Sequence, residues 1–92
     1  MLKTVKLHLL SKGIKPHIKG FDYLASAIIL CQNNKSYLHN LTKDLYPEIA
    51  KQYNEKPTSV ARTIRYLLIR SGTRMTNREF LANVLIELAL KK

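Results

Sequence analysis

Residues 46–69 read YPEIAKQYNEKPTSVARTIRYLLI and predict a short helix, a tight turn and a longer helix. This is the order of a helix-turn-helix motif. Ala50 is small where the second helix must cross close to the first. Asn54, four residues later, stands at the turn and tolerates the left-handed backbone conformation that the turn requires. The predicted core between the two helices consists of Ile49, Tyr53, Val60 and Ile64.

The second of these helices, about residues 57–71, has an apolar side and a hydrogen-bonding side. At about 100° per residue, the apolar side holds Val60, Ile64, Leu67, Leu68 and Ser71. The candidate base-reading side holds Thr58, Ser59, Arg62, Arg65 and Tyr66. An arginine can hold a guanine through two parallel hydrogen bonds, worth about 1–3 kcal/mol of discrimination, and recognition helices read bases with their N-terminal residues. A solvated helix face with ordinary arginines is the alternative interpretation.

Apolar residues recur at helical spacing along the rest of the chain, which predicts an all-α, compact five-helix domain. The other expected helices span residues 2–12, 21–33, 42–53 and 77–91, and residues 35–41 are ambiguous. Pro47 is disruptive inside a helix but tolerated in its first turn. The third helix is therefore expected either to begin near Tyr46 or to kink there.

The ends of several helices are marked in the sequence. Gly13 and Gly72 are expected to terminate the first and fourth helices. Thr76 or Asn77 is the natural N-cap of the last helix, with Glu79 nearby to complete the cap.

The net charge of the 92 residues is +10, from 16 Lys and Arg against 6 Asp and Glu. It gathers in two zones without any acid: residues 1–20 hold five lysines, and residues 56–78 hold Lys56 and all five arginines. Such a charge predicts a polyanionic partner. A membrane would require basic residues beside an exposed apolar face. The arginines of the second zone instead oppose a face that must be buried, so this zone favours DNA, while the charge of residues 1–20 has no assigned role.

Several basic residues outside the base-reading side are candidates for contacts to DNA phosphates. They are Lys43, Lys51, Lys56, Arg70 and Arg74. Such contacts position a protein on DNA without specifying sequence. His17 and Lys19 precede an expected helix start near Phe21, where a phosphate can bind, and a packing role for this loop is the alternative.

Other classes of protein are disfavoured by the sequence. The longest apolar run, Ala27 to Cys31, is too short to span a membrane, and the N-terminal lysines are unlike a signal peptide. Cys31, the sole cysteine, is expected to be a buried thiol in the cytoplasm. His8, His17 and His39 are too scattered for a metal site. We expect no catalytic residue, metal or cofactor.

Four stretches give the chain a resemblance to a known family. They are HIKGFDYLASAI (17–28), LTKDLYPEIAKQYN (41–54), SVARTIR (59–65) and TNREFLANV (76–84). The chain resembles the C-terminal DNA-binding effector domain of the stage-zero sporulation master response regulator of spore-forming bacteria. The resemblance implies an all-helical DNA-binding domain that activates or represses sporulation genes and binds tandem copies of a short operator. By similarity, the base-reading positions are Thr58, Ser59, Ala61, Arg62 and Arg65.

The sequence departs from this family in three respects. The family has an arginine where this chain has Ser59 and a glutamate where it has Ala61, so the base preference is expected to differ. The family has a further helix between the recognition helix and the last helix, an interval that this chain crosses with residues 72–75. The family also carries a receiver domain, whereas we expect residues 1–92 to form a single DNA-binding domain without one.

The sequence therefore predicts a regulator of transcription that binds double-stranded DNA specifically. The resemblance adds a homodimer on tandem sites, and RNA polymerase or a related full-length regulator as protein partners, and no membrane partner is expected. The alternative is a protein-interaction module that pairs with a full-length regulator, and binding of RNA or of the chromosome without sequence preference is a third, weaker option. The candidate surface for protein pairing is the apolar stripe Phe80, Leu81, Val84, Leu85 and Leu88, for which closing the core is the competing role.

Overall fold

The computed structural model describes residues 2–16 and 18–91 and is all-α over these residues, with five α-helices and no strand. The α-helices are α1 (Leu2–Ser11), α2 (Ile18–Asn33), α3 (Tyr46–Tyr53), α4 (Pro57–Arg70) and α5 (Asn77–Leu90). Two short elements, the 3₁₀ helix η1 (Lys35–His39) and the π-helical turn η2 (Leu41–Leu45), connect α2 to α3. The predicted five-helix architecture is thus confirmed.

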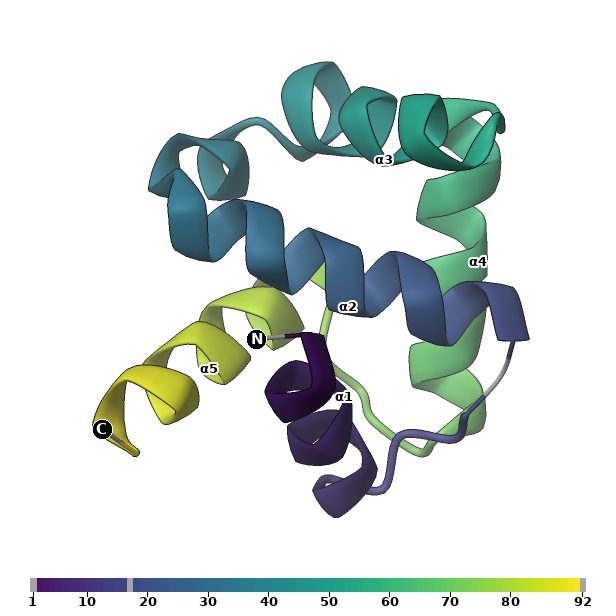
Figure 1. Ribbon diagram of the computed structural model, residues 1–92. Coiled ribbons are helices and arrows are strands. Elements are labelled where there is room, and N and C mark those ends of the chain that lie inside the picture. Colours follow the sequence, from purple (N-terminus) through teal and green to yellow (C-terminus); the bar gives the residue numbers. More distant parts are fainter. Residues whose placement is uncertain (1, 17, 92) are drawn as a thin grey trace.

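The central element is α2, which packs against the four other α-helices. Figure 1 shows α3 on one side of α2, α1 on the opposite side, and α4 standing across one end. Gly20 lies at the contact between α2 and α4, where an added Cβ would come within 3.3 Å of side-chain atoms of Leu67 and Thr63. A larger residue would therefore crowd the packing that holds α4 in place.

The core lies around α2 and receives side chains from every α-helix. Its largest fully buried side chains are Val5, Leu9, Leu24, Ile28, Leu45, Ile49, Val60, Ile64, Leu68, Phe80, Leu81 and Val84. The stripe of α5 belongs to this core, because four of its five residues are buried and Leu85 is partly buried against them. The stripe thus closes the core, and it is not an exposed surface for a protein partner.

The predicted helix ends agree with the structure at most positions. Gly13 and Gly72, each the second residue after α1 and α4 respectively, adopt φ of +85° and +86°. The side chain of Thr76 accepts a hydrogen bond from the backbone N–H of Glu79, whose carboxylate accepts from the backbone N–H of Thr76, which completes the predicted capping box. The second helix begins at Ile18, three residues earlier than expected.

The stretch before the helix-turn-helix differs from the single helix expected over residues 42–53. The backbone winds as a π-helical turn over Leu41–Leu45, and α3 begins at Tyr46 with Pro47 in its first turn. Proline has no N–H to donate to the preceding turn, so the helical hydrogen-bond pattern restarts there. The prediction that the helix begins near Tyr46 is confirmed.

Candidate nucleic-acid interface

The turn between α3 and α4 has the backbone geometry of a helix-turn-helix motif. Asn54 is left-handed, with φ 54° and ψ 51°, as its place in the sequence predicted. Its N–H and that of Glu55 both donate to the carbonyl of Ala50, and the second of these bonds measures 2.8 Å. After this turn Pro57 starts α4, which lies across α3 (Figure 1).

The inner side of α4 is buried as predicted. Val60, Ile64, Leu67 and Leu68 are all buried, and Ile49 of α3 is buried in the same core. Tyr53 is the exception to the predicted small core. It is 40% exposed, packs edge-on against Tyr23 at 5.1 Å between ring centroids, and shares a hydrogen bond of 2.9 Å with Ser26.

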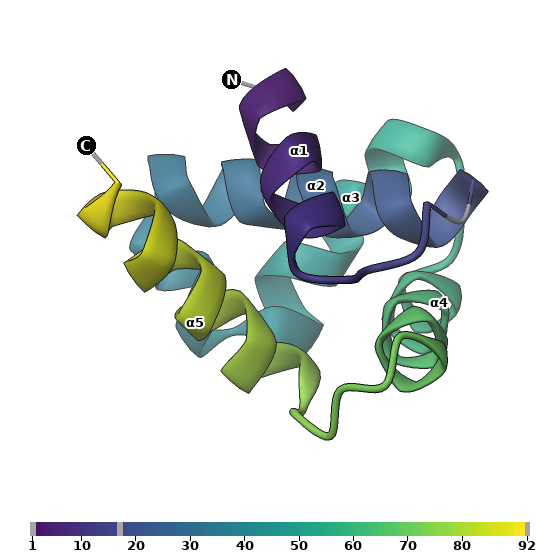
Figure 2. The ribbon, with the colours of Figure 1, turned by 90° about the horizontal axis from the view of Figure 1, so that it is seen from below.

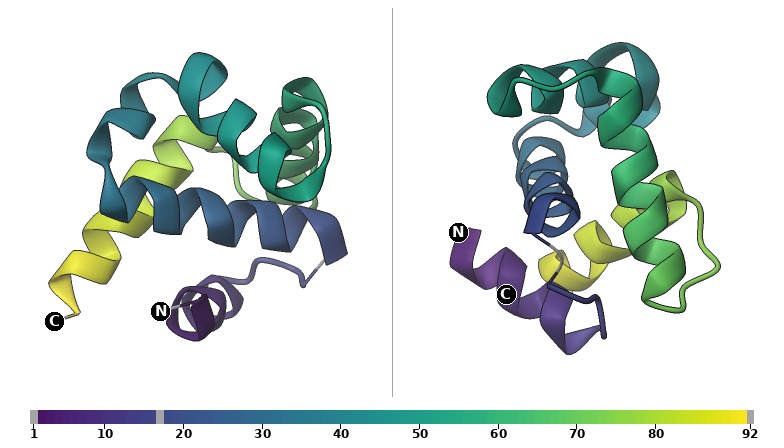
Figure 3. Two further views of the ribbon diagram at one scale, coloured as in Figure 1. Left: turned by 45° about the horizontal axis from the view of Figure 1, so that its top comes forward. Right: turned by 90° about the vertical axis from the view of Figure 1, so that its right-hand side faces the viewer.

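The outer side of α4 carries the candidate base-reading residues and lies at the edge of the molecule (Figure 3, left). Thr58, Arg62, Arg65 and Tyr66 are exposed there. Ser59 and Ala61 are half-buried, and Ala61 packs against the core. Since α4 contains no Asp or Glu, no carboxylate of its own repels an approaching phosphate or neutralises its arginines.

Arg70 is held along α4 by Tyr66. Its Nη1 donates a hydrogen bond of 3.1 Å to the Tyr66 hydroxyl, and its guanidinium lies 5.6 Å from the centroid of the Tyr66 ring. The hydrogen bond to Tyr66 raises the pKa of Arg70 further above its ordinary value, so the guanidinium stays charged. The arrangement turns the guanidinium toward the preceding turn of α4 rather than toward the loop that follows it.

The other candidate phosphate contacts are exposed but differ in their surroundings. Lys43 and Lys51 line a shallow hollow of about 440 Å³ that also contains Asp44 and Glu48. Arg65 and Arg74 line a second hollow, of about 350 Å³, at the carboxyl-terminal end of α4. The second hollow has basic and no acidic residues among its lining, so it is the more favourable of the two for a phosphate.

The segment before α2 gives less support to a phosphate site. Lys19 is exposed, and its Nζ lies 3.7 Å from a carboxylate oxygen of Glu55, beside the turn of the motif. The long distance and the exposure of Lys19 make this a weak ion pair. His17 lies outside the described residues.

Asn77 is a positioning residue that sequence reasoning treated only as a possible cap. Its Nδ2 donates to the Tyr46 hydroxyl at 2.9 Å and to the carbonyl of Ala61 at 3.2 Å. It therefore ties the start of α5 to both helices of the motif. Arg78 was equally missed: it donates to the carbonyls of Leu38 and His39, which attaches η1 to α5. Only the three-dimensional packing brings these partners together, because they lie 16 to 40 residues apart.

Three other functions were considered for the described residues: metal binding, thiol chemistry and membrane spanning. Within residues 2–16 and 18–91, no three His, Cys, Asp or Glu side chains gather closely enough to hold a metal ion. Burial raises the pKa of the Cys31 thiol to about 11, which suppresses its reactive thiolate form. Among the same residues, no helix is long and apolar enough to cross a membrane.

Fold and site together define the class of the protein: a small helix-turn-helix domain whose second helix, α4, contains arginines and no acidic residue. A comparison with family models matches residues 5–87 to the family described as sporulation initiation factor Spo0A C terminal. The chain belongs to this family, whose members are helical DNA-binding effector domains of a response regulator that controls sporulation genes. It is a family of DNA-binding regulators and not one of enzymes.

Proposed function

We propose that this chain regulates transcription in the cytoplasm by binding specific sites on double-stranded DNA, with α4 in the major groove. The observation that carries the proposal is the division of α4. Its apolar side is buried in the core, whereas Arg62 and Arg65 are exposed on a side without carboxylates. A recognition helix needs this division, because it must be held rigidly from behind while its outer side reads base edges.

The proposed base-reading residues are Thr58, Ser59, Ala61, Arg62, Arg65 and Tyr66. Arg62 and Arg65 are assigned to guanines, which offer two acceptors to an arginine. Tyr66 stands at the edge of this set, because its hydroxyl already accepts a hydrogen bond from Arg70. Ala61 has no hydrogen-bonding side-chain atom, so its part is limited to apolar contact, for example with a thymine methyl group.

Phosphate contacts are assigned to Lys43, Lys51, Lys56, Arg70 and Arg74, with Lys19 and His17 as further candidates. Four to six such contacts would make log affinity fall with log salt concentration with a slope of about −4 to −5. Homodimers on tandem sites, RNA polymerase and a related full-length regulator are proposed as partners on the basis of family membership. The resemblance implies a further helix in the family where this chain has residues 72–75, between α4 and α5, so the proposal includes no contact through such a helix.

Selection of bound duplexes from a random library, followed by sequencing, tests the proposal. A sharp motif is expected. Arg62→Ala should then weaken binding to the selected site by about 1–3 kcal/mol and have little effect on random duplexes. Arg74→Ala is the matched control, because loss of a phosphate contact weakens binding to all duplexes alike and reduces the salt slope by about 1.

Two results would contradict the proposal. If no motif emerges from the selection, binding is not sequence-specific. If Arg62→Ala and Arg74→Ala weaken binding to both kinds of duplex equally, Arg62 does not read bases. The double change Ser59→Arg with Ala61→Glu introduces the residues that the family has at these positions, and it should shift the selected motif.

The surface predicted for the alternative function, pairing with another regulator, is not accessible, because the α5 stripe is buried. A protein that is monomeric by light scattering and fails to shift DNA at low salt would reopen this alternative on another surface.

A further inference from the structure

The N-terminal helix α1 has two unlike sides. Val5 and Leu9 are buried in the core, and His8 is buried beside α5. The neighbouring arc of the helix, called the α1 outer face from here on, runs from Leu2, beside Leu9, round to Leu7 and also holds Lys3, Lys6 and Leu10. Its three leucines are 48%, 56% and 44% exposed in that order. At about 100° per residue, leucines and lysines alternate around this continuous arc of the helix.

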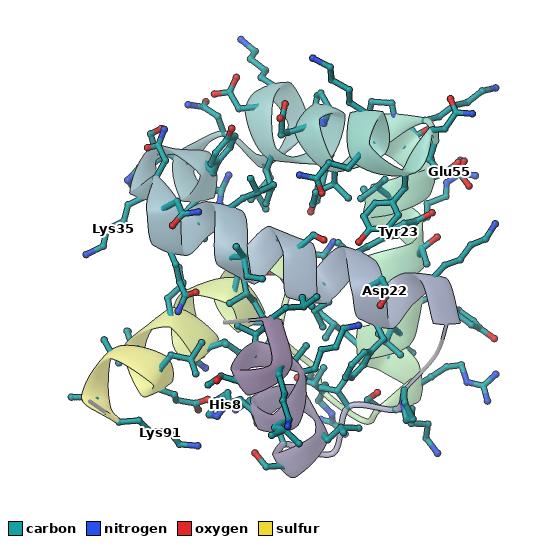
Figure 4. All side chains as sticks on the ribbon, in the orientation of Figure 1. His8, Asp22, Tyr23, Lys35, Glu55 and Lys91 are labelled. Atoms are coloured by element: carbon teal, nitrogen blue, oxygen red, sulfur yellow. The ribbon has the colours of Figure 1, made fainter. Side chains whose placement is uncertain are left out.

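The end of α5 packs beside the buried side of α1, through His8, and not on the α1 outer face (Figure 2). Lys91 donates from Nζ to Nδ1 of His8 at 3.1 Å, and Nε2 of His8 bonds Glu87 at 2.8 Å. Figure 4 shows His8 and Lys91 on this side, where α1 and α5 meet. Leu90, next to Lys91, is 80% exposed.

Charge around the α1 outer face is positive. Asp22 lies 3.0 Å from Nζ of Lys6 and offsets its charge, and Glu87 likewise pairs with Lys12 at 2.8 Å, so the exposed Lys3 supplies the charge of the face. No acidic residue occurs within α1 itself. The face therefore complements a surface that is both anionic and apolar.

Three kinds of occupant could cover such a face, and the structure favours one. A second copy placed by twofold symmetry would bring the lysines of one α1 toward those of the other, which is repulsive. A partner helix docks in a groove, but both hollows described above are lined by residues from η1, η2 and α3 or from α4 and the loop after it. A lipid surface needs no groove, because it deforms around protruding leucines while lysines extend toward its phosphates.

We propose that the α1 outer face binds the surface of an anionic lipid bilayer. Leu2, Leu7 and Leu10 enter the boundary between headgroups and acyl chains, and Lys3 contacts lipid phosphates. This departs from the expectation that the protein has no membrane partner. That expectation was drawn from the arginine zone, and the pattern of residues 1–12 did not indicate which side of the first helix is buried.

The proposed lipid surface and the proposed DNA surface are separate. The helix α1 lies on the side of α2 away from α3, whereas α4 packs against the first turns of α2 through Gly20 (Figure 1). Binding of lipid through α1 therefore leaves α4 free, and the lipid proposal stands or falls independently of DNA binding.

Cosedimentation of the full chain with lipid vesicles tests the proposal. Binding is expected to vesicles of mixed phosphatidylglycerol and phosphatidylcholine, and much weaker binding to phosphatidylcholine alone. No binding to the anionic vesicles, or equal binding to both kinds, would overturn the proposal. A duplex added in excess should leave the protein on the vesicles, and its release would mean that lipid and DNA compete for α4, which also overturns the proposal.

Matched variants distinguish the α1 outer face from general stickiness. Leu7→Ser should weaken vesicle binding about tenfold, whereas Ile69→Ser, at a residue of α4 with nearly equal exposure, should change it less than about twofold. Lys3→Gln should weaken binding about fivefold, and Lys35→Gln, on the exposed surface of η1, should have a smaller effect. Equal losses within either pair would overturn the assignment to α1.

Two further readouts keep the result interpretable. Circular dichroism and DNA binding should be unchanged in Leu7→Ser, because the residue is exposed and lies away from α4. The protein could instead fail to bind anionic vesicles and sediment as a dimer that Leu7→Ser makes monomeric. That result would assign the face to a second copy and overturn the lipid proposal.

Discussion

The helices α1 and α4 are both basic and both amphipathic, but their apolar residues differ in how far they are buried. In α4 the apolar residues that face α3 and α2 are fully buried, and the arginines point outward. In α1 the buried apolar residues are Val5 and Leu9, and three leucines share the outer face with lysines. Positive charge alone thus says little about the partner. The apolar residues beside the charge decide whether the surface suits the polar edges of bases or a lipid boundary.

The largest test of this comparison is the removal of one apolar side chain from each helix. Ile64 is fully buried, so Ile64→Ala should lower the free energy of unfolding by about 2–5 kcal/mol. Leu7 is 56% exposed, so Leu7→Ala should change it by less than about 0.5 kcal/mol. Urea unfolding followed by circular dichroism measures both values. Similar losses in the two variants would mean that the side of α1 described as exposed is buried in solution.

A second, smaller effect is expected at the turn that sets the position of α4. Asn54 has φ 54°, a conformation that costs an alanine about 1–2 kcal/mol. Asn54→Ala should lose about that amount of stability and weaken DNA binding, because the angle between α3 and α4 is no longer secured. Asn54→Gly is the control, since glycine adopts this backbone without strain. If Asn54→Ala and Asn54→Gly are equally stable, alanine adopts the left-handed conformation at this position without strain.

The contrast between the two helices also shows what the sequence could predict. The turn at Asn54, the start of α4 at Pro57 and the capping box at Thr76 depend on local backbone chemistry, and all three were predicted correctly. The buried side of α4 was predicted because its apolar residues occupy one arc. In α1 the apolar residues spread over about 200° of the helix, a wider arc than the core covers, so the pattern did not indicate which part of that arc is buried.

Long-range contacts account for the remaining differences. The prediction placed Tyr53 in the core of the motif, but Tyr23 and Ser26 of α2 hold it at the surface. The links of Asn77 to α3 and α4 likewise depend on how α5 returns to the motif. The base-reading and phosphate-binding assignments remain predictions, because they concern a partner that only the proposed DNA experiments supply.

A third test addresses how α1 is attached to α5. Hydrogen bonds from Lys12 and then from His8 hold the pKa of Glu87 below its ordinary value of 4.5. The unfolded chain therefore binds this proton more readily, so the stability due to Glu87 is present above about pH 4.5 and is lost as the pH falls through the lowered pKa. Because the carboxylate is 39% exposed, the effect should be below about 1 kcal/mol.

Urea unfolding at a series of pH values measures this contribution. Glu87→Gln should reduce the loss of stability on acidification. It should leave DNA binding at neutral pH unchanged, because Glu87 lies beside α1 and not in α4 or the turn before it. An unchanged acid response in Glu87→Gln would show that the attachment of α5 to α1 does not depend on the charge of Glu87. The other carboxylate with a lowered pKa, Glu79, accepts from the backbone of Thr76 and remains as an internal reference in this variant.

The smallest expected effect concerns the edge of the proposed base-reading side of α4. Tyr66→Phe keeps the ring beneath Arg70 but removes the hydroxyl that accepts from Nη1. An exposed hydrogen bond contributes about 0.5–1 kcal/mol, so affinity should fall about two- to fivefold. If the hydroxyl serves mainly to orient Arg70 toward a phosphate, Tyr66→Phe should lower the affinity equally for selected and random duplexes. In a chain that already carries Arg70→Ala, Tyr66→Phe should then have no further effect. If the loss is confined to the selected site, Tyr66 reads a base directly, and the base-reading surface of α4 extends into its second half, beyond the N-terminal residues that recognition helices normally use.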